Sequence, residues 1–290
     1  MLVTFPTDKR PITLLVTVTT RSPEEICLFA KSDTKPSTFY TKRKGVVNGE
    51  RVFEIRMPKS PANLSIGIYN SRNGLYKNNE DKSFSVKITP KTLKTCPIWL
   101  SHDTAEFVKF AQWFSENASM LSANIMRNGK VEPSIYGSEK RKFIIIYFNK
   151  IKEKIRDKKT GEVLGYGGSV DTPARIGNST GRIEVSKEDF LKFSVPMRMI
   201  ILLHEFSHKY MNPLINRPVT DEISADINAA MIYLSLGYSP VEAQQAYLTV
   251  LRKANNKGNF KRFLILRDFI RKFEKGDIAC NVSDTSKKAA

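Results

Sequence analysis

Two of the three histidines in this 290-residue chain stand four positions apart, in the pattern H-E-x-x-H formed by His204, Glu205 and His208. Residues i and i+4 lie on the same face of an α-helix, so both imidazoles can bind one metal ion. Glu205 lies about 100° around the helix from His204, and it can therefore reach a water at the metal without being a ligand. The pattern predicts a metal centre on a helix. The plainer interpretation is a helix that carries two histidines on its surface or in its core.

A zinc site that carries out hydrolysis needs a third protein ligand and one open position. The three-histidine pattern of the metzincins would place that ligand at position 214, which is Leu214, so this option is excluded. The remaining histidine, His102, has no spacing that connects it with the motif. The chain does offer two carboxylates downstream, Glu222 and Asp226, which are again i and i+4 and share one face of a second predicted helix.

At these residues the sequence resembles the gluzincin group of zinc metallopeptidases, in which a first helix carries H-E-x-x-H and a second carries E-x-x-x-D. The zinc ligands that the resemblance implies are His204, His208 and Glu222. Glu205 would be the general base, and Asp226 would hold a ligand histidine from behind. The implied cofactor is one Zn²⁺ ion.

The resemblance covers roughly residues 103–275 and implies hydrolysis of peptide bonds. In that mechanism the pKa of a water bound at the zinc falls toward neutrality. Glu205 accepts the proton of this water and passes it to the leaving amine. The family's usual oxyanion donor, a further histidine downstream, is missing here. The candidates to replace it are three tyrosines: Tyr233, Tyr238 and Tyr247.

The elements that must position these residues are expected ahead of the motif and after it. Apolar side chains at helical spacing predict a long helix over 103–126, and a buried strand is expected over 142–151. A strand is also expected near 182–186, and the resemblance implies that it is the sheet edge that pairs with extended substrate. The chain then reads as helical from Ser194 to about Lys275.

A short loop joins the two predicted site helices. The segment Asn212–Val219 contains Pro213 and Pro218, and its length favours two helices packed closely across one metal. The helices that follow it are rich in basic residues toward the C-terminus.

Residues 1–95 have a different pattern, with alternating apolar side chains and turn residues such as Asn48-Gly49 and Asn73-Gly74. Six or seven short strands in this length suggest an immunoglobulin-like β-sandwich, and Lys91–His102 reads as a linker. We therefore expect an α+β protein. A β-sandwich adaptor domain at 1–95 precedes a zincin-like metallopeptidase domain at 103–290, with a mixed sheet, the H-E-x-x-H helix and a C-terminal helical lobe.

Composition and charge limit the class of protein and the compartment in which we expect it. The formal charge is +18, and 41% of the residues are hydrophobic, which excludes a wholly disordered chain. No apolar run approaches the roughly 18 residues of a membrane helix, and charges at 8–10 interrupt any secretion signal. Cys27, Cys96 and Cys280 are predicted to be free thiols in a reducing compartment. The expected location is the cytoplasm or a virion.

Three functions compete on these observations. The first is an active zinc peptidase acting on a protein or peptide, with a protein partner bound through the β-sandwich. The second is a structural component of an assembly, such as a ring or head-tail protein of a tailed phage, that carries a zincin-like domain. The third is a nucleic-acid-binding module that only contains the motif. The basic charge suits an acidic partner or nucleic acid, but no nucleic-acid-binding motif supports the third function.

Overall fold

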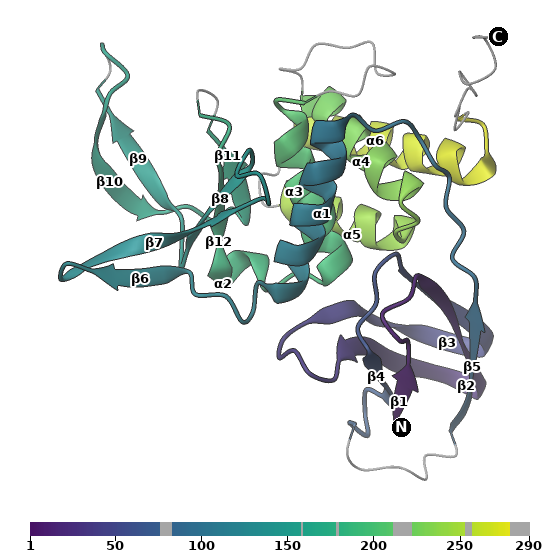
Figure 1. The fold of residues 1–290 in the computed structure, drawn as a ribbon. Helices are drawn as coiled ribbons and strands as arrows, with labels where there is room; N and C mark the ends of the chain where they lie inside the picture. The colour runs from purple at the N-terminus through teal and green to yellow at the C-terminus, as the bar shows by residue number, and fades with distance from the viewer. Residues whose placement is uncertain (76–82, 158, 178–179, 211–221, 253–256, 279–290) are drawn as a thin grey trace.

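The fold is taken from a computed structural model of the chain (Figure 1). The residues that it describes are 1–75, 83–157, 159–177, 180–210, 222–252 and 257–278. The protein is α+β: an N-terminal sheet packs against a second part in which helices cover a mixed sheet.

The N-terminal part is a single sheet, in which the strands follow the order β1-β4-β2-β3 and β5 pairs with β2. Its strands are β1 (Leu2–Pro6), β2 (Ile12–Ser32), β3 (Phe39–Met57), β4 (Asn63–Asn70) and β5 (Phe84–Lys91). The first half of β2 pairs with β5 and its second half with β4, while β3 runs along both halves. The described residues thus form five strands, two of them long, where six or seven short ones were expected. The immunoglobulin-like arrangement stays a prediction.

Alternation along these strands builds the core of this part. The even-numbered residues of β2, from Leu14 to Ala30, are mostly buried, and the residues between them are mostly only partly buried. Inward side chains of β3 and β4 join them in one hydrophobic cluster. The apolar side chains that share this face are thereby removed from water together, and Val195 of α3 joins them.

The second part contains a five-stranded sheet in the order β11-β12-β8-β7-β6 and a separate two-stranded sheet of β9 and β10. Its strands are β6 (Asn124–Arg127), β7 (Lys130–Gly137), β8 (Ile144–Phe148), β9 (Lys152–Arg156), β10 (Val163–Ser169), β11 (Ala174–Ile176) and β12 (Ile183–Ser186). β12 and β8 are parallel, and the other neighbours are antiparallel. The strand expected over 142–151 is confirmed as β8.

The strand expected at the edge of the sheet is instead the second strand from that edge. The strand expected near 182–186 is β12, which lies inside the sheet between β8 and β11. The edge is β11, which has three residues. So short a strand shows no readable alternation in the sequence, and only the pairing of Ala174 with Val185 and of Ile176 with Ile183 defines it.

The helices are α1 (His102–Asn117), α2 (Lys187–Phe190), α3 (Val195–Ser207), α4 (Glu222–Ser235), α5 (Pro240–Arg252) and α6 (Lys257–Lys275). They confirm the helical character expected after Ser194. No helix or strand lies between the end of β5 and the start of α1, in the segment expected to be a linker. The predicted loop Asn212–Val219 lies outside the described residues.

The helix expected over 103–126 is wrong beyond Asn117. Backbone carbonyls after the helix are taken by side chains from the sheet and α2. The Tyr147 hydroxyl donates to the carbonyl of Ala118 at 2.9 Å, and the Lys187 ammonium donates to that of Leu121 at 2.7 Å. These bonds satisfy groups that a longer helix would have paired internally, and the chain turns into β6.

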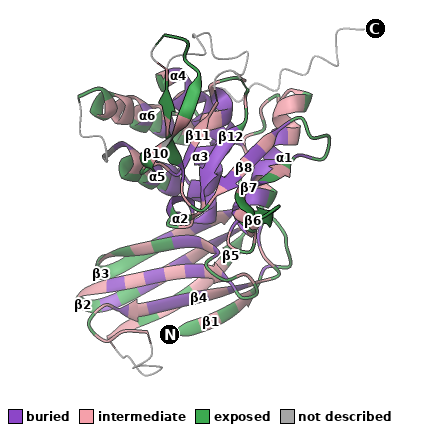
Figure 2. Cartoon of the chain, turned by 90° about the vertical axis from the view of Figure 1, so that its left-hand side faces the viewer, coloured by how far each residue is buried: buried purple, intermediate pink, exposed green. Residues whose placement is uncertain are grey.

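Helix α3 lies at the centre of the second part and is buried almost throughout (Figure 2). It packs against α1, α4 and α5 and against the sheet. Its apolar residues occur on every side, which is the pattern of a helix surrounded by protein. Pro196 occupies its first turn, where a missing N–H costs nothing. The helix ends at Ser207, so that His208 is the C-terminal cap.

Buried polar side chains join the two parts. The guanidinium of Arg198 in α3 is fully buried and donates to four carbonyls, among them that of Ser37 in the N-terminal part. The buried carboxylate of Glu242 in α5 accepts from Thr41 Oγ1 at 2.6 Å and from Ser194 Oγ at 2.7 Å. A half-buried pair lies farther along, where Arg56 of β3 binds both oxygens of Glu274 in α6 at 3.1 and 3.0 Å.

Cys96, in the linker, is disulfide-bonded, whereas Cys27 is free. The expectation of three free thiols is therefore wrong at Cys96, and Cys280 lies outside the described residues. Within the ranges that the structure describes, no helix is both long and apolar enough to cross a membrane.

Candidate metal centre

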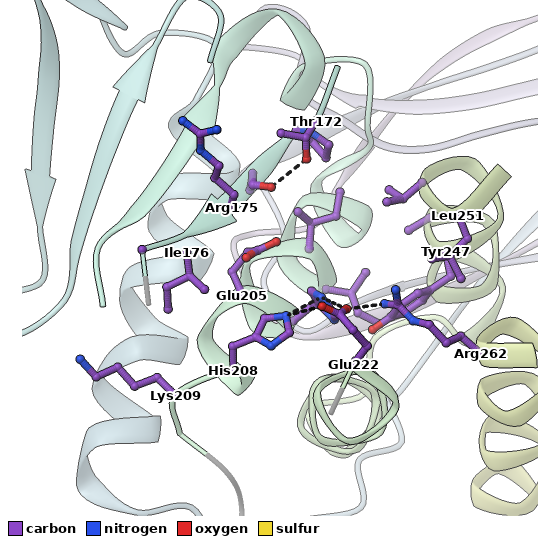
Figure 3. Close-up of a pocket in the computed structure, with 18 residues that line it drawn as sticks. Thr172, Arg175, Ile176, Glu205, His208, Lys209, Glu222, Tyr247, Leu251 and Arg262 are labelled. Carbon is purple, nitrogen blue, oxygen red and sulfur yellow. Dashed lines mark hydrogen bonds and ion pairs between the residues drawn. The ribbon is translucent and has the colours of Figure 1, made fainter. Parts of the chain in front are cut away.

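A cleft of about 640 Å³ opens between β11 and helices α3 to α6, and the H-E-x-x-H residues lie in its wall (Figure 3). Helix α3 brings His204 and His208 to one face, with their ring centroids 4.7 Å apart. Glu222 reaches the same place as the first residue of α4. The face that the spacing i, i+4 predicts is thus the face turned toward the second helix.

The three side chains converge on one point. Nε2 of His204 and Nε2 of His208 are 3.1 Å apart, and the carboxylate oxygens of Glu222 lie 3.5 and 3.6 Å from them. A tetrahedral ion with bonds of about 2.0–2.2 Å holds its ligand atoms roughly 3.3–3.6 Å apart. The group can therefore hold a metal ion, and two imidazoles with one carboxylate are ligands that suit zinc.

Asp226 lies behind His204, as the i, i+4 relation to Glu222 requires. Its side chain is 2% exposed, and Oδ1 lies 2.9 Å from His204 Nδ1, in a contact that is not aligned as a linear hydrogen bond. The contact occupies the nitrogen that faces away from the ligand cluster. A carboxylate in this position selects which ring nitrogen is presented to a metal.

The electrostatics of the cluster favour a cation. Burial alone would lower the pKa of His204, but contacts with Asp226 and Glu222 raise that pKa to about 10. The contact with His204 in turn lowers the pKa of Glu222 to about 2. Burial and the charge on His204 lower the pKa of His208. The carboxylates therefore stabilise positive charge at the point where the three ligand atoms meet.

Glu205 lies beside this cluster and outside the three-residue ligand group. It points into the cleft next to β11 (Figure 3). Burial raises the pKa of its carboxyl group, against the positive charge on His204 and a backbone hydrogen bond from Ile176. A raised pKa makes a carboxylate a better proton acceptor, which fits the predicted role.

The three tyrosine candidates separate in the structure. Tyr247 of α5 lines the cleft, its ring centroid 6.4 Å from that of His204. Its hydroxyl donates to the Asp226 carbonyl at 3.4 Å. Tyr233 and Tyr238 stack on each other with centroids 4.8 Å apart, and neither lines the cleft. The structure therefore brings only Tyr247 of the three to the site.

Two features of the site were not expected from the sequence. Arg262 of α6 lines the cleft and contacts both Asp226 and Glu222. The edge strand β11 forms the opposite wall with Arg175 and Ile176. Arg262 is one basic residue among many in α6, and no spacing rule connects it with the motif, so the sequence carries no signal for it.

Comparisons with models of known protein families, with curated proteins and with solved structures find no match to this chain.

Proposed function

We propose that the protein is a zinc-dependent peptidase with His204, His208 and Glu222 as the zinc ligands. The observation that carries the proposal is the convergence of these three ligand atoms within 4.8 Å of one another in the wall of a cleft. A zinc ion held there would polarise the scissile carbonyl and lower the pKa of a water molecule.

Glu205 supplies the proton transfers. Its carboxylate lies in the cleft, outside the ligand group, and takes a proton from the attacking water. The same carboxyl group then gives that proton to the leaving amine. Burial, which raises its pKa, assists the first step because it strengthens the carboxylate as a base.

Strand β11 is the element against which a peptide substrate would lie. Its pairing with β12 uses one edge, and the cleft opens at Thr172–Gly177. An extended peptide can add to an exposed sheet edge through backbone hydrogen bonds. The proposed substrate is accordingly an extended segment of protein or peptide.

The test combines metal analysis with one substitution. The purified 290-residue chain is expected to hold about one zinc per chain and to cleave members of a random peptide library. Glu205→Gln should retain the zinc and lose about 10³-fold or more of the cleavage rate. Glu188→Gln, an exposed glutamate of α2, is the matched control and should change neither. Zinc that persists in a His204→Ala, His208→Ala double variant would overturn the proposal.

A structural role in an assembly, such as a phage ring or head-tail component, is the alternative. Under this alternative the protein also binds about one zinc per chain, but it does not cleave peptides. Wild-type protein that holds zinc, cleaves no member of the library and assembles into rings of defined stoichiometry would favour this alternative over the peptidase.

A further inference from the structure

Arg262 of α6 contacts both Glu222 and Asp226, and no other lysine or arginine among the described residues is given contacts with the two. Its side chain is 17% exposed and lines the cleft. Figure 3 shows it on the side of Glu222 that faces Tyr247, away from β11. It therefore reaches the candidate metal centre from a helix that contributes no ligand.

The contact with Asp226 is a two-point contact. Nε of Arg262 donates to Oδ2 at 2.8 Å, and Nη2 donates to Oδ1 at 3.0 Å. A guanidinium that binds a carboxylate through two parallel hydrogen bonds fixes the plane of that carboxylate. The fixed oxygen, Oδ1, is also the one that lies 2.9 Å from Nδ1 of His204.

Nη2 of Arg262 also contacts Glu222. Nη2 of Arg262 lies 2.9 Å from Oε2 of Glu222, and this oxygen is 3.5 Å from Nε2 of His204. Glu222 is about half exposed, so the surrounding core alone does not hold its side chain. One guanidinium thus touches the residue that orients a ligand histidine and the carboxylate ligand itself.

We propose that Arg262 is a positioning residue of the metal centre. Its planar fork sets the orientation of Asp226, and through Asp226 that of His204, while Nη2 holds Glu222 toward the two histidines. The inference rests on the metal site in the proposed function, and it does not depend on peptidase activity.

Charge and geometry make opposite predictions for this residue. A positive charge near a metal ion repels it, so an Arg262 that acted through charge alone would weaken metal binding. An Arg262 that acts by positioning strengthens it. Lysine retains the charge and cannot make the two parallel bonds. Arg262→Lys therefore separates the two effects, and Arg262→Gln removes both.

The experiment measures the zinc affinity of the 290-residue chain by competition with a chelating dye, together with the visible spectrum of the cobalt(II) form. Arg262→Lys is expected to bind zinc about tenfold or more weakly than wild type, which is the usual effect of losing a residue that orients metal ligands. Its cobalt(II) spectrum should change because the ligand geometry changes. Arg271→Gln, on the same helix and paired with exposed Asp268 at 3.1 Å, is the matched control and should leave both unchanged.

The outcomes are separable. Arg262→Lys with wild-type affinity and spectrum, or Arg262→Gln with a wild-type cobalt(II) spectrum, overturns the positioning role and leaves the proposed function standing. A wild-type chain that binds no zinc overturns both. Thermal melting of each variant identifies any that fails to fold. Should Arg262→Gln be one of these, Arg262→Lys alone decides.

Discussion

Oδ1 of Asp226 lies 2.9 Å from Nδ1 of His204, and Nε2 of the same ring lies 3.5 Å from Glu222. The imidazole therefore stands between two carboxylates that come from one helix, one turn apart. Nε2 of His204 faces the ligand group, while Nδ1 is held by Asp226. A change at Asp226 should therefore affect metal binding through the orientation of His204.

Asp226→Asn is expected to weaken zinc binding about 10–100-fold, because the amide neither holds His204 Nδ1 nor balances Arg262 as a carboxylate does. Competition with a chelating dye measures the change. Asp268→Asn, an exposed aspartate on α6, is the control and should bind zinc like the wild type. Equal affinities for Asp226→Asn and wild type would remove Asp226 from the site.

Tyr247→Phe tests the only tyrosine candidate that lines the cleft. If its hydroxyl stabilises the oxyanion, kcat should fall about 10²-fold while KM and zinc content stay the same. Tyr238→Phe is the matched control, since that ring lies outside the cleft against Tyr233. Steady-state kinetics on a cleaved peptide give the answer, and equal kcat for the two variants would exclude Tyr247.

Glu242→Gln tests the junction between the two parts of the fold. The carboxylate accepts from Thr41 and Ser194 and lies 3.5 Å from Arg43, and glutamine replaces one acceptor with a donor. We expect a loss of about 2 kcal/mol in the free energy of unfolding, measured by urea denaturation of the full chain. Glu188→Gln should lose almost nothing, and equal losses for the two would show that the junction adds no stability.

Asp189 gives a prediction for pH. Burial raises the pKa of its carboxyl group, but hydrogen bonds from Lys192 and Ser186 outweigh it, so that the pKa lies below its ordinary value of 3.8. A carboxyl group with a lowered folded-state pKa contributes stability above its unfolded-state pKa, and that contribution is lost as pH falls through the folded-state value.

Asp189→Asn should therefore destabilise the protein by about 2 kcal/mol at pH 7, and the difference from wild type should shrink steadily below pH 4. Urea unfolding at several pH values measures it. A difference that stays constant from pH 7 to pH 2 would mean that ionisation of Asp189 contributes nothing.

Each half of the ligand cluster could be predicted because its geometry is local, whereas the meeting of the two halves was expected from the resemblance. The relation between His204 and His208 is fixed by helical spacing, and so is that between Glu222 and Asp226. Strand β8 was predictable for a similar reason, because a short apolar run bracketed by charges favours a strand, and its side chains alternate between partly and fully buried.

The missed features all depend on distant contacts. Arg262 is 36 residues from the aspartate it binds, and nothing in the basic pattern of α6 distinguishes it from its neighbours. The end of α1 at Asn117 depends on hydroxyl and ammonium donors from Tyr147 and Lys187. Strand β11 exists through its pairing with β12 alone.

Helix α6 carries Arg262 near one end and Glu274 near the other, where the glutamate binds Arg56 of β3. Twelve residues of helix place the two about 18 Å apart on one stiff rod. One continuous helix therefore contacts the ligand group through Arg262 and the N-terminal sheet through Glu274. The distance between the candidate metal centre and the N-terminal sheet is spanned by a single element of the fold.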